Sequence, residues 1–163
     1  MVPTLPPQKV FLLQGVFNSA AYDELKKKNV GEAFILEGRP GLEAARISSH
    51  ELTRRNIKAT LISDNMAGFL FYKNFVREVW VSYQSSGPDG ILCQIGGLIL
   101  GVLAKKHRIS VSAYPNGKDL RLMGKSKELI FFNGIKVAPK GIAGYVPLAE
   151  WVPSKYITKV YHG

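Results

Sequence analysis

Short runs of apolar and β-branched residues alternate with longer segments of helical spacing through the first two-thirds of the chain. Apolar runs of about four to eight residues, without regular polar alternation, are typical of strands buried on both faces of a sheet. These runs predict strands at Lys9–Gln14, Glu32–Leu36, Lys58–Ser63, Glu78–Ser82 and Ile109–Ala113. The segments between them predict helices at Ser19–Lys28, Leu42–Arg55, Met66–Tyr72 and Ile91–Lys106. The alternation predicts an α/β fold with a mostly parallel sheet, helices on both faces and right-handed crossovers.

The pattern changes after Pro115, where the chain becomes polar and rich in turn residues. Apolar runs on either side of Asn133-Gly134 predict a hairpin with a two-residue turn. The stretch Ala138–Pro153, with its prolines and glycines, predicts a loop, and Tyr156–Tyr161 is interpreted as a last strand or a short helix. We therefore expect one domain over residues 1–163, in which residues 116–163 form a C-terminal hairpin and an extended tail.

Composition places the chain among ordinary globular proteins, since 46% of its 163 residues are hydrophobic and 21% are charged. Its only cysteine, Cys93, excludes an intrachain disulfide and a zinc site made of cysteines. The first residues lack the apolar segment of a secretory signal, and no apolar stretch approaches the roughly 20 residues that span a bilayer. We expect a cytoplasmic protein without a membrane partner.

The net charge is strongly positive: 22 lysines and arginines against 12 acidic residues give +10. Such a balance favours anionic partners, namely nucleic acid, phosphorylated metabolites or an acidic protein. The excess divides evenly on either side of Asn116, so no dense basic stripe is visible in the sequence. The run Lys26-Lys27-Lys28 ends a predicted helix, where cations complement the helix dipole in any case.

Candidate ligand-binding residues follow the predicted strands, because ligands of open α/β sheets bind beyond the carboxyl ends of the strands. Arg39 precedes a predicted helix, and a guanidinium beside a helix N-terminus suits a phosphate or carboxylate; an exposed, solvated arginine is the alternative. Asp64 either caps the helix that follows it or faces a ligand hydroxyl. Glu43 and Arg46 lie in the first turns of the preceding helix, where a glutamate also complements the dipole.

Sequence motifs for cofactors and metals are missing. No Gly-x-Gly-x-x-Gly follows the first predicted strand, no P-loop motif occurs, and no spacing of His, Cys, Asp or Glu resembles a metal site. We expect no cofactor and no metal. Gly96, Gly97 and Gly101 are interpreted as packing positions inside the helix Ile91–Lys106, and Cys93 as a buried packing residue of the same helix.

Two long strings closely resemble the family of methylthioribose-1-phosphate isomerase, ribose-1,5-bisphosphate isomerase and the alpha, beta and delta subunits of translation initiation factor 2B. The strings are ILEGRPGLEAARISSHELTRRNIKATLISDNMAG and NGIKVAPKGIAGYVPLAEWVPSKYIT. The resemblance runs from about Lys9 to the C-terminus and corresponds to the C-terminal domain of the family alone. It implies a Rossmann-like fold and a homodimer formed through the C-terminal segments.

Departures from the family pattern fall on its catalytic positions. By the resemblance, Gly15 stands where the isomerases have a catalytic cysteine, and Gln84 or Tyr83 stands where they have a catalytic aspartate. An Asn-Lys pair of the family is replaced by Cys93-Gln94, and the glutamine of its QGAR motif by Glu43. The positions that match are Glu37, Arg39-Pro40, Arg46 and Asp64-Asn65-Met66.

Aldose–ketose isomerisation requires groups that move protons, and neither glycine nor glutamine does so near neutral pH. The favoured interpretation is a non-catalytic binding or assembly module, with a small phosphorylated ligand near Arg39, Arg46 and Asp64. A second is a sugar-phosphate isomerase with relocated acids, Glu43 and Asp64, or one completed by a partner chain. A third is a basic RNA- or ribosome-associated, translation-related protein.

Overall fold

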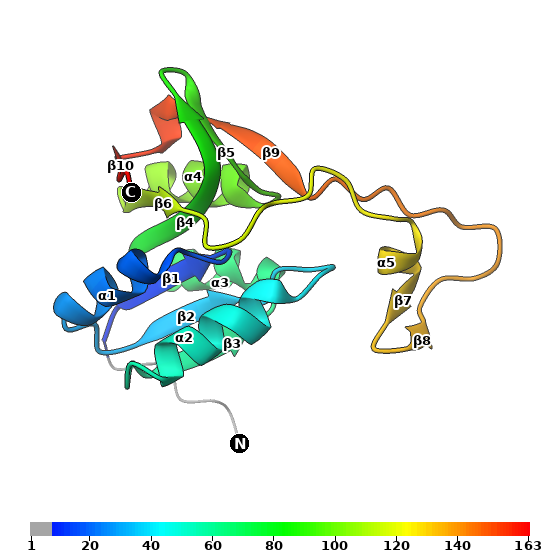
Figure 1. Ribbon diagram of the computed structural model, residues 1–163, viewed down its shortest axis with the longest axis horizontal. Helices are drawn as coiled ribbons and strands as arrows, with labels where there is room; N and C mark the ends of the chain where they lie inside the picture. The colour runs from blue at the N-terminus through cyan, green and yellow to red at the C-terminus, as the bar shows by residue number, and fades with distance from the viewer. Residues whose placement is uncertain (1–7) are drawn as a thin grey trace.

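A computed structural model describes residues 8–163; the first seven residues, in which the sequence shows no secretory signal, lie outside the described part. Its centre is a parallel sheet with the strand order β10-β6-β4-β1-β2-β3 (Figure 1). Along the chain these strands are β1 (Val10–Gln14), β2 (Ala33–Leu36), β3 (Ala59–Ile62), β4 (Val76–Gly87), β6 (Ser110–Pro115) and β10 (Lys159–Val160). The predicted strands are all present, and the parallel pairing confirms the expected sheet.

Helices cover both faces of the sheet, which confirms the α/β class. They are α1 (Ser19–Lys27), a π-helical turn η1 (Ala44–Ser48) continuing into α2 (Ser49–Thr53), a 3-10 turn η2 (Asp64–Met66) continuing into α3 (Ala67–Tyr72), and α4 (Gly97–His107). One buried cluster joins α1 and α2 to the sheet through Tyr22, Leu25 and Leu52. The other joins α3 and α4 to the opposite face through Phe71 and Leu100. No helix of the described residues is long and apolar enough to cross a membrane.

The prediction of one helix over Ile91–Lys106 is wrong in its first part. Residues of that run form β5 (Gly90–Gln94), which pairs antiparallel with an extended β4, so that the glycine turn after Gly87 is a hairpin. Cys93 therefore lies in a strand, although it is fully buried as expected. A short apolar run cannot by itself distinguish a buried strand from a helix. Gly96, at φ 101°, makes the break before α4.

The segment after Pro115 differs from the prediction in two places. β9 (Ala149–Pro153) pairs with β5 inside the expected loop, and α5 (Lys127–Ile130) replaces the start of the first hairpin strand. The hairpin itself is confirmed: β7 (Phe131–Phe132) and β8 (Ile135–Lys136) flank Asn133 and Gly134, both at positive φ. The expected last element consists of η3 (Ser154–Tyr156) and β10.

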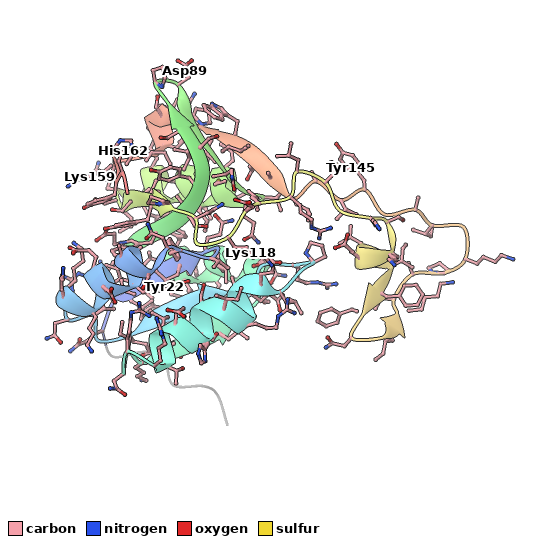
Figure 2. The ribbon with its side chains drawn as sticks, viewed as in Figure 1. Tyr22, Asp89, Lys118, Tyr145, Lys159 and His162 are labelled. Carbon is pink, nitrogen blue, oxygen red and sulfur yellow. The ribbon has the colours of Figure 1, made fainter. Side chains whose placement is uncertain are left out.

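Residues 118–148, here called the arm, project from the body of the molecule (Figure 1). The arm leaves the sheet after β6 and returns at β9, and it carries α5, β7 and β8. Tyr145 lies on the segment that returns toward the body, well short of the tip of the arm, and Lys118 lies near the root of the arm, beside the body (Figure 2). The root of the arm therefore meets the carboxyl ends of the strands, where the ligand-binding candidates were placed.

Candidate functional site

A pocket of about 180 Å³ lies where the loop after β2 faces the root of the arm; we call it the rim pocket. Four segments line it: the loop after β2, the end of β5 and each of the two ends of the arm. The lining residues are Gly38, Arg39, Pro40, Gly41, Glu43, Gln94, Lys118, Asp119, Leu120, Arg121 and Leu148. The structure thus brings Arg39, Glu43 and Gln94 together, and it adds charged residues of the arm.

Asp64 holds the loop that carries Arg39. Its two carboxylate oxygens accept hydrogen bonds from the backbone N–H groups of Gly38, at 2.9 Å, and Arg39, at 2.8 Å. The expected helix cap is wrong, because Ser63 occupies the N-cap position and Asp64 reaches across to the neighbouring strand end. Charge-assisted bonds of this kind are about twice as strong as neutral ones. Asp64 therefore positions the pocket loop.

The Arg39 guanidinium is the free cation of the pocket. It packs over the ring of Phe132, 4.0 Å from the ring centroid, which ties the pocket loop to the arm. Within residues 8–163 it has no ion pair, and its Nε is enclosed without a hydrogen-bond acceptor. Buried donors in proteins are normally satisfied, so this group is suited to an anionic ligand. Arg39 also lines a second, more apolar cavity of about 490 Å³ beside Asp64 and Asn65.

Three of the other charged residues of the pocket have ion-pair partners, whereas Asp119 has none among residues 8–163. Glu43 forms an ion pair with Lys118, across from the loop to the arm. Arg121 pairs with Glu128 on the arm. The hydrogen bond from Arg121 and a second from the backbone N–H of Lys125 lower the pKa of Glu128 to about 2. Ion pairs at exposed positions exchange readily with competing anions, because each contributes only about 0–1 kcal/mol.

At Gly15, where the isomerases were expected to carry a catalytic cysteine, neighbouring side chains occupy the space that a side chain would need. Gly15 has φ +92°, and a Cβ built there would lie 2.0 Å from the hydroxyl oxygen of Ser82 and 3.7 Å from the amide oxygen of Gln94. The same amide lies against Gly38, where a Cβ would meet its nitrogen at 2.9 Å. Gln14 in turn donates to the backbone oxygen of Ile95 at 3.0 Å. A hydroxyl and an amide thus lie at the Cβ position of Gly15, and neither of them titrates near neutral pH.

The candidates for the catalytic acid have structural partners. Gln84 accepts hydrogen bonds from the backbone N–H of Leu120, at 2.9 Å, and from the Asn116 side chain, at 3.2 Å, so that it holds the root of the arm. The hydroxyl of Tyr83 donates to the backbone oxygen of Tyr161 at 2.6 Å. Neither side chain lines the rim pocket. Both sit within β4, which runs past the expected strand end at Ser82.

Three further candidates lie apart from the pocket. Arg46 is exposed and lies outside the lining. Asn65 lines the second cavity and shares a hydrogen bond of 2.9 Å with Ser63. Glu37 follows β2 and is half-buried, and its backbone forms hydrogen bonds with Ile62 of β3 and Ala45 of η1. Among residues 8–163, no group of three or more His, Cys, Asp and Glu side chains could hold a metal ion.

Sequence reasoning missed the residues that the arm contributes. Lys118, Asp119 and Arg121 lie in a stretch recognised only as polar and turn-rich, and the close spacing of charges was its one signal. Glu150 was missed as well. Its carboxylate accepts from the backbone N–H groups of Gly96, at 2.7 Å, and Leu98, at 3.0 Å, and so caps α4.

Comparison with known proteins links the chain to one group. Residues 12–161 match the sequence pattern of the Initiation factor 2 subunit family. Methylthioribose-1-phosphate isomerase of Thermus thermophilus is 29% identical over 158 residues, covering 90% of this chain and 48% of the isomerase. The Geobacter sulfurreducens isomerase is 34% identical, covering 86% of this chain and 43% of its own. The chain thus spans about half the length of these curated relatives.

Two solved structures share the fold. Subunit delta of the translation initiation factor eIF-2B from A. fulgidus superposes with a TM-score of 0.82 at 22% identity, covering 96% of this chain and 52% of its own. The 5-methylthioribose 1-phosphate isomerase from Pyrococcus horikoshii OT3 gives 0.81 at 22% identity, covering 96% and 50%. A factor subunit and an enzyme are thus about equally similar in fold, so the fold does not choose between them.

Proposed function

Because the chain belongs to the initiation factor 2 subunit family, we propose that it is a non-catalytic form of the domain that this family shares with the isomerases. In this proposal it binds a small phosphorylated ligand in the rim pocket. The observation that carries it is the Arg39 guanidinium, which lines the pocket without an anionic partner among residues 8–163. A guanidinium fork suits phosphate oxygens, and Lys118 and Arg121 lie within the same pocket.

The absence of catalysis is the second part of the proposal. The point opposite Gly15 holds the Ser82 hydroxyl and the Gln94 amide, which neither release nor take up protons near neutral pH. Asp64 uses both of its oxygens on the pocket loop, and Glu43 is paired with Lys118. Of the carboxylates that line or support the pocket, only Asp119 lacks a partner among residues 8–163, and three cations, Arg39, Lys118 and Arg121, line the same pocket. This balance favours holding an anion.

Calorimetric titration with methylthioribose-1-phosphate and ribose-1,5-bisphosphate tests the binding. A hydrogen bond to a charged group contributes about 1.5–3 kcal/mol, so Arg39→Gln is expected to weaken binding at least about tenfold. Arg46→Gln is the matched control, because it removes the same charge from an exposed position outside the pocket. No measurable binding, or equal weakening in both variants, would refute the assignment.

A sugar-phosphate isomerase, either with relocated catalytic groups or completed by a second chain, is the alternative function. It is favoured by the curated relatives, which are isomerases about twice as long as this chain. In that case Glu43 and Asp64 would be the relocated acids. Turnover of either sugar phosphate by the purified protein, abolished by Asp64→Asn, would establish the alternative and defeat the non-catalytic proposal.

A homodimer formed through the arm is also part of the proposal. The arm exposes many large apolar side chains, which mark surfaces that associate with a partner. They are Leu122, Met123, Phe131, Ile135, Val137, Ile142 and Tyr145. Light scattering on a sizing column should show a dimer that Ile135→Ser dissociates. Ile99→Ser is the control, since Ile99 on α4 is 65% exposed against 67% for Ile135.

The cytoplasm is the compartment we assign to this function. The lone thiol, Cys93, is buried and unpaired, and burial raises its pKa to about 12. A protein without disulfides suits a reducing compartment. Fractionation of cells that express the tagged chain would test the assignment.

A further inference from the structure

Cations gather at the amino edge of the sheet, on the side opposite the rim pocket. In a parallel α/β fold all strands begin, and all crossover helices end, at this edge. The exposed cations that precede or begin β1, β3, β4 and β6, or end α1 to α4, are Lys9, Lys26, Lys27, Lys28, Arg54, Lys58, Lys73, Arg77, Lys105, Lys106 and Arg108. We call this set the amino-edge surface. The fold thus assembles a basic surface from positions that are scattered along the sequence.

Strand register aligns the cations that enter the sheet. Ser110 pairs with Glu78, so Arg108 lies level with Val76, beside Arg77. Val10 also pairs with Val76, so Lys9 lies one residue before this position, just outside the amino end of β1. These residues come from three adjacent strands, β6, β4 and β1. With Lys58 at the start of β3, the row crosses five strands, about 19 Å at the usual spacing of 4.8 Å.

Acidic side chains at this edge do not cancel the charge. Glu32 precedes β2, and its carboxylate is 3.0 Å from Lys58, so it neutralises one cation of the row. Glu51 pairs in the same way with Arg54 at the end of α2. Glu78 is turned onto the sheet, where it accepts hydrogen bonds from Trp80 and Ser112. Lys9 meets only a neutral group, the amide oxygen of Asn74 at 3.0 Å.

Aromatic rings lie among these cations at the ends of α3 and α4. Tyr72 is 77% exposed, and the Lys73 ammonium lies 5.3 Å from its ring centroid. Phe71 packs on His107 at 5.6 Å, which places the last turns of the two helices side by side. Tyr72 therefore presents a free ring face next to Lys73, with Lys106 on the neighbouring helix end.

We propose that the amino-edge surface binds single-stranded RNA, with phosphates along the row of cations and a base stacked on Tyr72. An extended row of cations beside an exposed aromatic ring is the arrangement with which proteins hold single strands of nucleic acid. A single strand of RNA would use both the charge and the exposed ring of Tyr72 beside Lys73, whereas a polyanion without bases would use the charge alone. This site is independent of the rim pocket, which lies at the other edge of the sheet.

Fluorescence anisotropy with labelled decauridylate at several salt concentrations tests the proposal. If about four phosphates are contacted, the logarithmic salt slope is about −3, which is a loss of roughly fifty-fold between 50 and 200 mM salt. The triple variant Lys73→Gln, Arg77→Gln, Lys106→Gln should make the slope shallower by about 2. Tyr72→Ala should weaken binding about tenfold, through the lost stacking.

A matched control comes from the arm. The triple variant Lys127→Gln, Lys136→Gln, Lys140→Gln has the same net charge and should bind the RNA as the unchanged chain does. The proposal would be overturned by any of three results. The protein fails to bind the RNA at low salt, the two triple variants weaken RNA binding equally, or the protein binds polyglutamate or phosphatidylserine vesicles more tightly than the RNA.

Discussion

The substitution Gly15→Ala tests whether the expected catalytic position is closed to any side chain. At φ +92° an alanine adopts a backbone conformation that costs about 1–2 kcal/mol. Its Cβ would also lie 2.0 Å from Oγ and 3.2 Å from Cβ of Ser82, and overpacking of this kind costs about 1–3 kcal/mol. The free energy of unfolding should therefore fall by about 2–5 kcal/mol.

Urea denaturation followed by tryptophan fluorescence measures this loss, because Trp80 lies in the buried core. With an m-value of about 2 kcal/mol/M, the midpoint should fall by about 1–2.5 M. Adding Ser82→Ala removes the oxygen and leaves the 3.2 Å contact, so the double variant should recover about 1–2 kcal/mol of the overpacking cost.

Gly141→Ala separates the two causes. Gly141 has φ +93°, almost the same as Gly15, but no atom lies within 4 Å of a Cβ built there. This control should lose no more than the backbone cost of about 1–2 kcal/mol. The reasoning is refuted if Gly15→Ala is as mild as the control, or if Ser82→Ala restores nothing.

Two further predictions concern titrating groups. Burial raises the pKa of Cys93 to about 12, so its thiol should stay protonated to pH 10 and react with a disulfide reagent only after unfolding; rapid reaction of the native protein would contradict this. Arg121 lowers the pKa of Glu128 to about 2. The ionised carboxylate, which holds Arg121 and the Lys125 backbone N–H, therefore stabilises the arm fully above about pH 4.5, and this stabilisation is lost as the pH falls toward 2. Hydrogen exchange at the Lys125 amide should follow that titration, and Glu128→Gln should abolish the dependence.

The parallel sheet could be predicted from the sequence because each strand is a short apolar run bounded by turn residues. The hairpin at Asn133-Gly134 could also be predicted, because these two residues tolerate positive φ. β5 could not, since the apolar run from Ile91 continues without a change of composition into α4. What separates them is the backbone of Gly96 and the pairing with β9, more than fifty residues away.

The candidate site was predictable only in part, for a related reason. Arg39 and Asp64 follow strands, so topology places them at one edge of the sheet. The contacts of the loop after β2 depend on where the arm folds back, because the arm brings Phe132 to Arg39 and Lys118 to Glu43. The closure at Gly15 depends on Ser82 in the adjacent strand β4, and no local pattern reports such a contact. The amino-edge surface could not be predicted either, because its cations are scattered along the sequence and only the fold brings them to one edge of the sheet.

Hydrogen exchange at C2 of methylthioribose-1-phosphate in D₂O most directly tests whether the residues around Gly15 handle protons. Proton NMR of the sugar, followed with protein and without, measures both exchange and ketose formation. The account predicts that the two rates stay at the protein-free level even where calorimetry shows the ligand bound. Exchange or ketose formation that depends on the protein, and that disappears in Asp64→Asn, would contradict the account.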